Sequence, residues 1–369
     1  MATMNKILSA ASAGSRQSAG ASEVDQKLMK LLDGLKTSIR VVGVGGAGCN
    51  TVTRLSEMGI EGAETITMNT DAQDLLHSVA DNKILLGAEL TGGLGAGADP
   101  KMGESAAKES MEELAAALQG ADLTFITCGL GGGTGTGASP VVAEVAKNSG
   151  SITVSIVTLP FTVEGTVRWQ NAEHGLATMK KHVDAVIVIP NDRLMELVPD
   201  LPLNSAFKVS DELLANAIKG TVEMITKPGL MNLDFADFRT ILSNGATAVF
   251  GIGESTSEKY TENRAIEALE EALHSPLLDT DVSMADRAIV NVVGGPDMTL
   301  QEAQSAVEYL SSKISPQANI IWGAQIDSGI GKNNVRVMVI LTGVRTSDFF
   351  AGAPGSKNRS HLDLDIGYI

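Results

Sequence analysis

Glycines and carboxylates are the residues of this sequence whose types and spacing point to chemistry. The stretch GLGGGTGTG, residues 129–137, contains six glycines in nine residues, and a glycine inside an element costs roughly 0.5–1 kcal/mol relative to alanine. Such a density indicates backbone that lies close to another group or adopts positive φ. The stretch follows an apolar run and precedes a helical pattern. Its N–H groups are therefore available to phosphate oxygens at a helix N-terminus.

Two further glycine loops have the same setting. GVGGAG, residues 43–48, fits G-x-G-x-x-G between a strand pattern and a helix pattern, and GGLGAGADP, residues 92–100, also precedes a helix pattern. The first loop alone would suit an NAD-dependent oxidoreductase with Asp71 on the ribose. Three loops suit a triphosphate better than the pyrophosphate of NAD. No glycine loop is followed by Lys-Ser or Lys-Thr, which excludes a P-loop. The alternative is a set of tight turns that serve packing.

An acidic group follows the long helical pattern of residues 210–229. Asn232, Asp234 and Asp237 lie just beyond the Pro-Gly dipeptide that ends this pattern. Paired carboxylates can orient and polarise the water that attacks a phosphoryl group. These three residues are the candidate catalytic residues, and the alternative is an acidic loop that only faces solvent.

Alternating strands and helices must position the glycine loops. Short apolar runs, with helical patterns such as residues 101–118 between them, predict a parallel sheet with helices on both faces. Ligands of such sheets bind at the carboxyl ends of the strands, which is where the loops lie. The runs occupy residues 39–45, 64–70, 82–87, 123–129, 151–160 and 184–192.

A second, smaller α/β region follows the long helix, for which Ser210 is a plausible N-cap. Strands are predicted at residues 246–255, 287–295, 318–327 and 335–344, and helices at 262–274 and 300–314, the latter with a Thr299/Glu302 capping box. The fold class is α/β, with a Rossmann-like parallel sheet, a long central helix and a smaller C-terminal α/β domain. The predicted units are a flexible tail with a short helix at 1–37, a nucleotide-binding domain at 38–209, the central helix at 210–229, a C-terminal domain at 230–345, and a linker with a partner peptide at 346–369.

Composition excludes several classes of function. The 369 residues carry a formal net charge of −16, so a nucleic-acid partner, which usually meets a basic stripe, is not expected. Two distant cysteines predict buried thiols in a reducing cytosol, and five scattered histidines predict no zinc site. The uncharged run at residues 123–143 contains too much glycine and threonine to insert into a membrane, and the N-terminus lacks the apolar core of a signal peptide. The sequence therefore predicts a cytoplasmic protein.

The loops together carry a family resemblance. GGGTGTG, residues 131–137, is similar to the signature of the tubulin/FtsZ superfamily, and GVGGAGCN, NTDAQ, PFTVEGTVR, IPNDRL and GLMNLDFAD resemble the other FtsZ loops in the same order. The resemblance covers roughly residues 39–344. It implies the tubulin/FtsZ fold and a GTP-dependent cytoskeletal polymer that assembles from copies of itself at the mid-cell division site. GADPK, residues 97–101, departs from bacterial members, which more often have Asn and Glu in place of Asp99 and Lys101.

The resemblance also implies which residues bind GTP or GDP. Mg²⁺ is expected to be held through phosphates and water, without a dedicated protein site. Glu164 and Arg168 match the family's ribose and phosphate contacts, and Asn191, Phe207 and Asp211 match its guanine pocket. The remaining residues expected to line the nucleotide are Gly46, Ala47, Gly48, Cys49, Asn50, Gly97, Ala98, Gly133, Thr134 and Gly135.

The chemistry of these residues agrees with a guanine pocket. A carboxylate such as Asp211 can accept hydrogen bonds from both N1–H and N2–H₂ of guanine, whereas adenine offers no such pair, and unmatched polar groups are costly. The alternative is a first-turn Asp that interacts only with the helix dipole. Phe207 could stack on the base, and its alternative is a core phenylalanine.

Helix length separates the acidic residues from this pocket. At 1.5 Å per residue, Asp211 and Lys227 are about 25 Å apart. The acidic residues therefore lie at the far end of the domain and cannot easily reach their own nucleotide. They either face solvent or serve the GTP of a neighbouring subunit in a head-to-tail filament, as the resemblance implies.

The end of the chain suggests a partner. LDLDIGYI, residues 362–369, alternates apolar and acidic residues, a pattern that can dock as a strand or in a groove. We expect a membrane-tethering division protein as the partner, and the alternative is a strand that folds back on its own body. The Pro-x-Phe-Leu peptide of bacterial relatives is missing, which favours an archaeal member. A paralogue with a cell-shape role and a scaffold with a vestigial nucleotide are the competing functions.

Overall fold

The computed structural model describes residues 37–193, 203–227, 229–230, 235–242, 246–255, 264–275, 278 and 281–344. All elements below belong to one compact unit that begins at Ser38. The predicted N-terminal tail and the linker and peptide at 346–369 lie outside the described residues, and so do Asn232 and Asp234.

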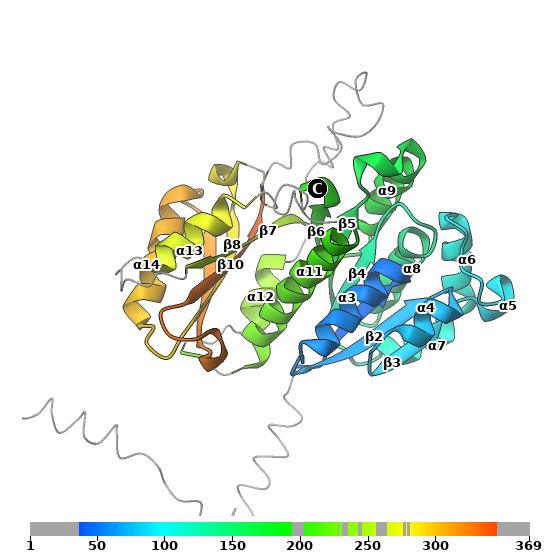
Figure 1. Cartoon of the computed structure of the whole chain (residues 1–369), viewed down its shortest axis with the longest axis horizontal. Coiled ribbons are helices and arrows are strands. Elements are labelled where there is room, and N and C mark those ends of the chain that lie inside the picture. The colour runs from blue at the N-terminus through cyan, green and yellow to red at the C-terminus, as the bar shows by residue number, and fades with distance from the viewer. Residues whose placement is uncertain are drawn as a thin grey trace, which may run out of the picture. The chain divides into compact units, whose positions relative to one another are not determined.

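Ten strands form one sheet within the described residues, in the order β3-β2-β1-β4-β5-β6-β7-β10-β8-β9 (Figure 1). The strands from β3 to β7 run parallel, β10 is antiparallel to both β7 and β8, and β9 is parallel to β8. The predicted parallel sheet is therefore confirmed. The strands are β1 Ile39–Val44, β2 Ala63–Asn69, β3 Asn82–Leu85, β4 Leu123–Gly129, β5 Ile152–Leu159, β6 Ala185–Pro190, β7 Ala246–Ser255, β8 Arg287–Gly294, β9 Asn319–Ile326 and β10 Val335–Thr342.

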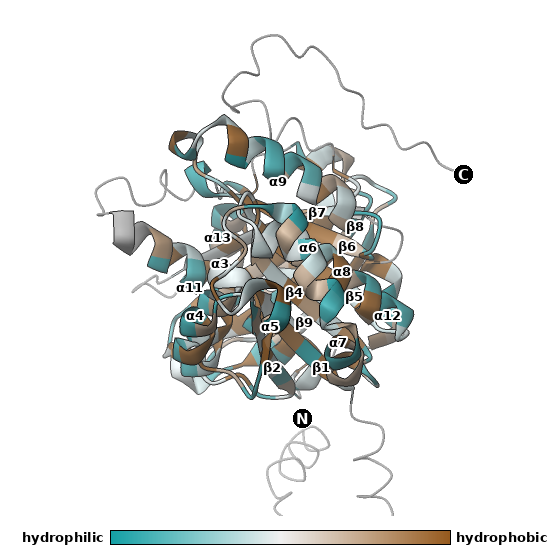
Figure 2. Ribbon diagram, turned by 90° about the vertical axis from the view of Figure 1, so that its right-hand side faces the viewer, coloured by the Kyte–Doolittle hydropathy of each residue, from teal (hydrophilic) through white to brown (hydrophobic). Residues whose placement is uncertain are grey.

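Helices cover both faces of this sheet, which is why a central strand such as β5 is buried along its whole length. In Figure 2, hydrophilic stretches mark the outer helices α5, α9 and α12. No described helix is long and apolar enough to cross a membrane. The helices are α3 Gly45–Glu57, α4 Ala72–His77, α5 Ala88–Thr91, α6 Pro100–Glu109, α7 Met111–Leu118, α8 Thr134–Asn148, α9 Thr166–Met179, α11 Leu203–Thr226, α12 Phe235–Leu242, α13 Arg264–Leu273 and α14 Leu300–Lys313, with short 3-10 turns at Thr162–Glu164, Val282–Met284 and Ser328–Ile330.

Helix α11 joins the two halves of the chain through a shared core. Its buried residues Leu214, Ile218 and Val222 pack with α3 and with strands of the N-terminal half, and the same cluster includes Ile289 of β8 and Met338 of β10. Helices α13 and α14 cover the opposite face of the C-terminal strands, and α8 and α9 cover the opposite face of the N-terminal strands. The boundaries between the predicted domains remain predictions, because the sheet continues from β6 into β7.

The structure corrects two helix predictions. Helix α11 begins at Leu203, seven residues before the predicted N-cap Ser210, because LNSAFKV contains no glycine or proline that would stop a helix. The helical pattern of residues 101–118 is two helices, which meet at Ser110. The Ser110 hydroxyl accepts a hydrogen bond from Gly87 N at 3.1 Å, a tertiary contact that the periodicity does not reveal. The Thr299/Glu302 capping box is confirmed.

Candidate nucleotide-binding site

The three glycine loops meet in a cleft of about 440 Å³ at the carboxyl ends of β1 and β4. All but three of the predicted binding residues line it. Gly48 and Cys49 are buried in α3 and Asn50 is exposed, and none of the three lines the cleft. The predicted residues that line the cleft are Gly46, Ala47, Gly97, Ala98, Gly133, Thr134, Gly135, Glu164, Arg168, Asn191, Phe207 and Asp211.

Two helix N-termini open onto the cleft. Helix α3 begins at Gly45 and α8 begins at Thr134, and neither has a side-chain cap or an acidic residue in its first turn. Their first N–H groups are therefore left for an anion, which the positive end of each helix dipole also attracts. The third loop differs, because Asp99 caps its own helix by accepting from Lys101 N at 3.0 Å. That loop contributes Gly97 and Ala98 to the cleft.

The glycines of the densest loop divide into two kinds. A Cβ on Gly137 would lie 1.9 Å from the carbonyl oxygen of Pro100, and a Cβ on Gly135 would lie 2.4 Å from that of Gly129. At these two residues glycine allows close contact between backbone segments. The alternative interpretation, that the glycines form tight turns for packing, is therefore correct for part of the loop. Gly132 has nothing within 4 Å of an added Cβ and lines the cleft. Its lack of a side chain leaves room for a ligand.

The cleft is acidic in its side chains. Four carboxylates, those of Asp71, Asp74, Glu164 and Asp211, line it together with a single described cation, Arg168, which forms an ion pair with Glu164. A polyphosphate would therefore be attracted mainly by backbone N–H groups and helix dipoles. A divalent cation on the phosphates would offset the remaining repulsion from the carboxylates.

Asp211 lies at one side of the cleft, more than two turns into α11. The alternative of a first-turn Asp on the helix dipole is therefore wrong. Thr51 of α3 donates from Oγ1 to Asp211 Oδ1 at 3.3 Å. Burial raises the pKa of the Asp211 carboxyl to about 6, and the bond from Thr51 only partly opposes this shift.

Two further predicted residues share this side of the cleft. The Phe207 side chain is 41% exposed and meets the ring of Phe161 edge-on, with 5.2 Å between the ring centroids. A core role for Phe207 is excluded by this exposure. Asn191 is buried, and its Oδ1 has no hydrogen-bond partner among the described residues. A free acceptor, a carboxylate and an exposed ring together suit a purine that carries hydrogen-bond donors.

The set of predicted binding residues left out several residues of the cleft. Asn69 lines it, and its Nδ2 has no partner among the described residues. Asp71 caps α4 by accepting from Gln73 N and Asp74 N at 2.9 and 3.2 Å, and this cap brings Asp74 to the cleft. The signal was present, because NTDAQ had the spacing of an N-cap directly after a strand.

Asp237, the one candidate catalytic residue within the described part of the chain, does not line the cleft. It lies exposed in the first turn of α12. Asp211 and Thr226, the last residue of α11, are about 22 Å apart along the helix. The end of α11 from which the chain continues to Asp237 is therefore the end remote from the cleft.

Comparison with known proteins decides the family. Residues 38–199 match the model of the Tubulin/FtsZ family, GTPase domain, and residues 246–345 match the model of the FtsZ family, C-terminal domain.

The chain belongs to the FtsZ family.

Relatives in this family cover most of the chain. Cell division protein FtsZ 1 of Thermococcus kodakarensis is 56% identical over 350 residues, which cover 94% of this chain and 92% of the relative. Cell division protein FtsZ 1 of Methanocaldococcus jannaschii is 56% identical over 322 residues, 87% of each chain. The solved structure of an empty FtsZ dimer from M. jannaschii superimposes with a TM-score of 0.82 at 56% identity, covering 87% of this chain and 92% of that one.

A more distant neighbour shows the fold alone. CetZ1 from Haloferax volcanii, bound to GDP, has a TM-score of 0.74 at 22% identity. The FtsZ-family matches confirm the predicted tubulin/FtsZ fold, with a GTPase domain followed by a C-terminal domain. They do not favour the oxidoreductase that the first glycine loop alone would suit.

Proposed function

We propose that this FtsZ-family GTPase binds GTP in the glycine-loop cleft, assembles head to tail into filaments, and hydrolyses GTP at the contact between subunits. The observation that carries the proposal is the distance along α11 between the cleft and the acidic segment around Asp237. An acidic group that cannot reach its own nucleotide can reach that of the next subunit if each subunit presents one end to the other end of its neighbour. Such a heterologous contact produces open filaments.

Guanine selectivity rests on the side of the cleft near Asp211. The Asp211 carboxylate would accept from N1–H and N2–H₂ of guanine, and Asn191 offers a buried acceptor. Adenine has no N1–H and N2–H₂ pair to offer the Asp211 carboxylate, which is the kind of mismatch that discriminates strongly. Phe207 is exposed enough to meet the face of the base.

Mg²⁺ would be held through the phosphates and water. No group of three described His, Cys, Asp or Glu residues has the arrangement of a metal site. The carboxylates of Asp71 and Asp74 line the cleft beside the glycine loops, and hard oxygen ligands of this kind suit Mg²⁺ that keeps several waters. The ion would neutralise phosphate charge that these carboxylates otherwise repel.

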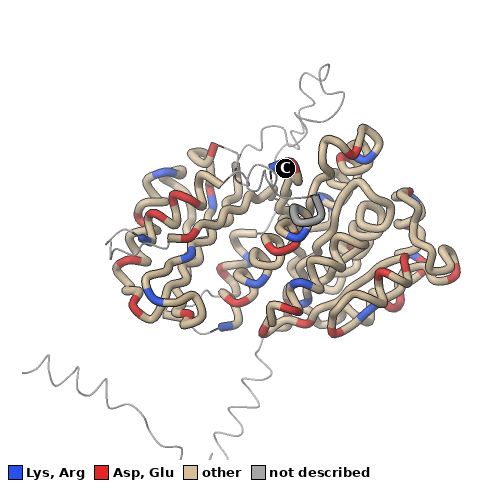
Figure 3. The backbone as a smooth tube through the Cα atoms, viewed as in Figure 1, with Lys and Arg blue, Asp and Glu red and all other residues tan. Residues whose placement is uncertain are grey.

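Exposed apolar side chains support a contact at both ends. Leu94 and Val163 are 87% and 89% exposed, and Leu94 lines the cleft, while Val163 directly precedes Glu164, which also lines it. At the other end, Leu230 is 52% exposed and Ile326 is 41% exposed. Large apolar groups exposed in clusters mark interaction sites. Charged positions of both signs are interspersed over the rest of the described backbone (Figure 3).

We also propose that the C-terminal peptide, residues 362–369, binds a division partner. This peptide lies outside the described residues. Its alternation of apolar and acidic residues suits addition to a strand or groove of a membrane-tethering protein at mid-cell. Deleting the peptide should leave GTP-dependent sedimentation unchanged and abolish mid-cell placement. Loss of folding on deletion would instead show that it packs on its own body.

A sedimentation assay tests the proposed function. The protein is incubated with GTP, GDP or NADH and Mg²⁺ and centrifuged, and the phosphate released is measured in parallel. We expect sedimentation and phosphate release with GTP only, and phosphate release that begins at a threshold protein concentration. Equal sedimentation with all three nucleotides would contradict the proposal.

A further inference from the structure

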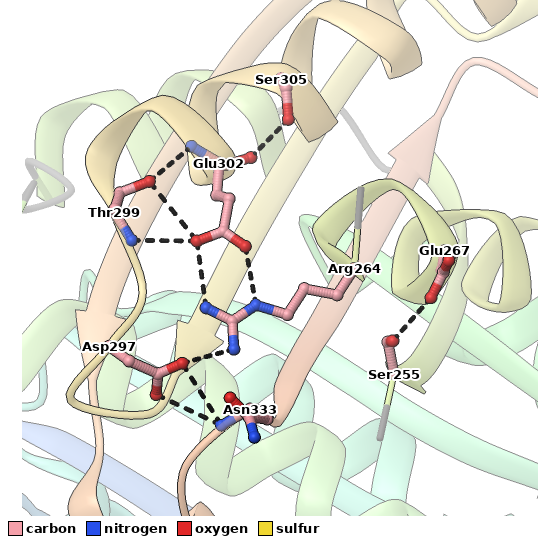
Figure 4. Close-up of polar contacts among 8 residues, drawn as sticks. All are labelled: Ser255, Arg264, Glu267, Asp297, Thr299, Glu302, Ser305 and Asn333. Atoms are coloured by element: carbon pink, nitrogen blue, oxygen red, sulfur yellow. Dashed lines mark hydrogen bonds and ion pairs between the residues drawn. The ribbon is translucent and has the colours of Figure 1, made fainter. Parts of the chain in front are cut away.

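Arg264, the first residue of α13, is a buried cation at a distance from the nucleotide cleft. Its side chain is 1% exposed. The guanidinium forms a two-bond fork with Glu302, from Nε to Oε1 at 2.7 Å and from Nη2 to Oε2 at 3.1 Å, and Nη1 donates to Asp297 Oδ2 at 2.6 Å (Figure 4). A planar guanidinium held on two sides fixes the orientation of both carboxylates.

This cluster joins segments that are far apart in the sequence. Glu302 belongs to α14 and also accepts from Thr299 N at 3.1 Å. Asp297 lies in the connection between β8 and α14, and both of its carboxylate oxygens accept from Asn333 N, at 3.2 and 3.3 Å. Asn333 lies in the connection between β9 and β10. The start of α13 is thereby fastened to both connections.

The β8–α14 and β9–β10 connections are also in close backbone contact. A Cβ on Gly295 would lie 2.1 Å from the carbonyl oxygen of Gly331, and Gly295 N donates to Asn334 O at 3.1 Å. Asn333 has a φ of +65°, a left-handed conformation that asparagine adopts more readily than most other residues. The hydrogen bonds from Asn333 N to Asp297 constrain the β9–β10 connection at this residue.

The end of β9, which enters this connection, holds the start of the acidic segment. Leu230 N donates to Ala324 O at 2.7 Å, and Gln325 Nε2 donates to Glu223 O of α11 at 3.0 Å. Leu230 directly precedes residues 231–237, which contain the candidate catalytic group. A displacement of the end of β9 would therefore displace Leu230, from which the chain leads to Asp237.

We propose that Arg264 and Asp297 are positioning residues for GTP hydrolysis across the subunit contact. They lock the β9–β10 connection, and through the end of β9 they hold the acidic segment where it meets the nucleotide of the neighbouring subunit. This inference rests on the proposed function. Neither residue lines the cleft, so the nucleotide bound by the same subunit is not affected by their loss.

The test substitutes Asp297→Ala in the full chain, which removes the bond to Asn333 and leaves the fork between Arg264 and Glu302. Ser255→Ala is the matched control, because Ser255 donates to Glu267 at 2.9 Å at the same end of the domain without joining the cluster (Figure 4). Affinity for GTP is measured at a protein concentration below the assembly threshold, and turnover above it. For Asp297→Ala we expect GTP affinity within twofold of the control and turnover at least tenfold lower, since a displacement of about 1 Å can cost as much as 10²-fold.

A mixing experiment separates positioning from general destabilisation. Asp297→Ala retains an intact cleft, and Asp211→Ala retains an intact acidic segment, so their contact would restore one complete site. We expect the turnover of the mixture to be at least fivefold above the sum of the turnovers of the two separate proteins. The gain would come from heterologous contacts that join the cleft of Asp297→Ala to the acidic segment of Asp211→Ala. Asp297→Asn, which keeps an acceptor for Asn333 N, is the conservative comparison and should retain more turnover than Asp297→Ala. Arg264→Lys, which cannot form the two-bond fork with Glu302, replaces Asp297→Ala if the alanine variant does not fold.

The possible outcomes are distinct. Recovery in the mixture supports the inference. Wild-type turnover of Asp297→Ala alone would overturn it. A third outcome is that Asp237→Ala mixed with Asp211→Ala recovers turnover but Asp297→Ala mixed with Asp211→Ala does not. This outcome would overturn the inference and leave the proposed function standing. Failure of both mixtures would overturn both.

Discussion

Thr51 of α3 and Asp211 of α11 meet through a hydrogen bond of 3.3 Å at the edge of the nucleotide cleft. The two helices bring together residues that are 160 positions apart in the sequence. The same Oγ1 lies 3.1 Å from Ala47 O, one turn earlier in α3, so its single proton is shared between the two acceptors. This contact holds the Asp211 carboxylate through its Oδ1 at the edge of the cleft.

Loss of the Asp211 carboxylate should weaken GTP binding more than tenfold, because two donors of the base would be buried without acceptors. The control is Glu212→Ala, at the next position of α11. It removes an exposed ion pair with Arg54 of α3 and should leave GTP affinity unchanged. Titration of GTP at low protein concentration measures both. If Asp211→Ala binds GTP with the affinity of the wild type and still rejects ATP, then another group recognises the base.

The raised pKa of Asp211 predicts a pH dependence for binding. The charged carboxylate is the form that accepts from guanine, so GTP affinity should fall as the pH drops through about 6. Asp211→Asn should bind weakly at every pH and lose this dependence between pH 5 and 7.5. An affinity of the wild type that is flat over this range would contradict the assignment.

The same pKa shift has a consequence for stability. A carboxyl whose pKa rises from 3.8 in the unfolded chain to about 6 in the fold binds its proton more tightly when folded. This group therefore lowers the stability of the empty protein above pH 6, and the penalty shrinks as the pH falls below 6 and is gone only below the unfolded pKa of 3.8. The melting temperature of nucleotide-free Asp211→Asn should exceed that of the wild type at pH 7.5, and the difference should shrink steadily as the pH is lowered from 6 toward 3.8.

Two glycines of the same loop should respond to alanine in opposite ways. Gly132→Ala has room for its Cβ, so the protein should fold normally and bind GTP at least tenfold more weakly, because the methyl group occupies space that phosphate oxygens need. Gly137→Ala places a Cβ 1.9 Å from Pro100 O, a clash that should cost about 1–3 kcal/mol or more of folding free energy. Denaturant unfolding and GTP titration distinguish them. Equal effects of the two substitutions on stability would contradict this division of the loop.

Local patterns in the sequence predicted the sheet and the cleft, because apolar runs, glycine loops and helix starts each depend on residues that are close together in the sequence. The start of α11 at Leu203 was missed because Ser210 resembles an N-cap, although no glycine or proline before it would stop the helix. The break at Ser110 depends on a contact with Gly87. The cluster of Arg264, Asp297 and Glu302 was missed because its members come from separate elements and share no motif.

The central claim is that two subunits complete one hydrolytic site. Asp237→Ala should leave GTP binding unchanged, because this exposed residue does not line the cleft, and should lower turnover by about 10²-fold or more, the scale of a lost acid–base group. Glu61→Ala is the control, since it removes an exposed acid paired with Lys227 near the same end of α11. Filaments of Asp237→Ala should form with GTP and persist.

The most direct measurement is the turnover of a mixture of Asp237→Ala and Asp211→Ala, each at a concentration above the assembly threshold. The first variant supplies an intact cleft and the second an intact acidic segment, so contacts between them contain one complete site. The account predicts that the mixture hydrolyses GTP well above the sum of the two separate variants, and that dilution below the threshold abolishes this gain. A mixture no more active than that sum, with a wild type whose turnover per molecule is constant on dilution, would show that each subunit hydrolyses its GTP alone.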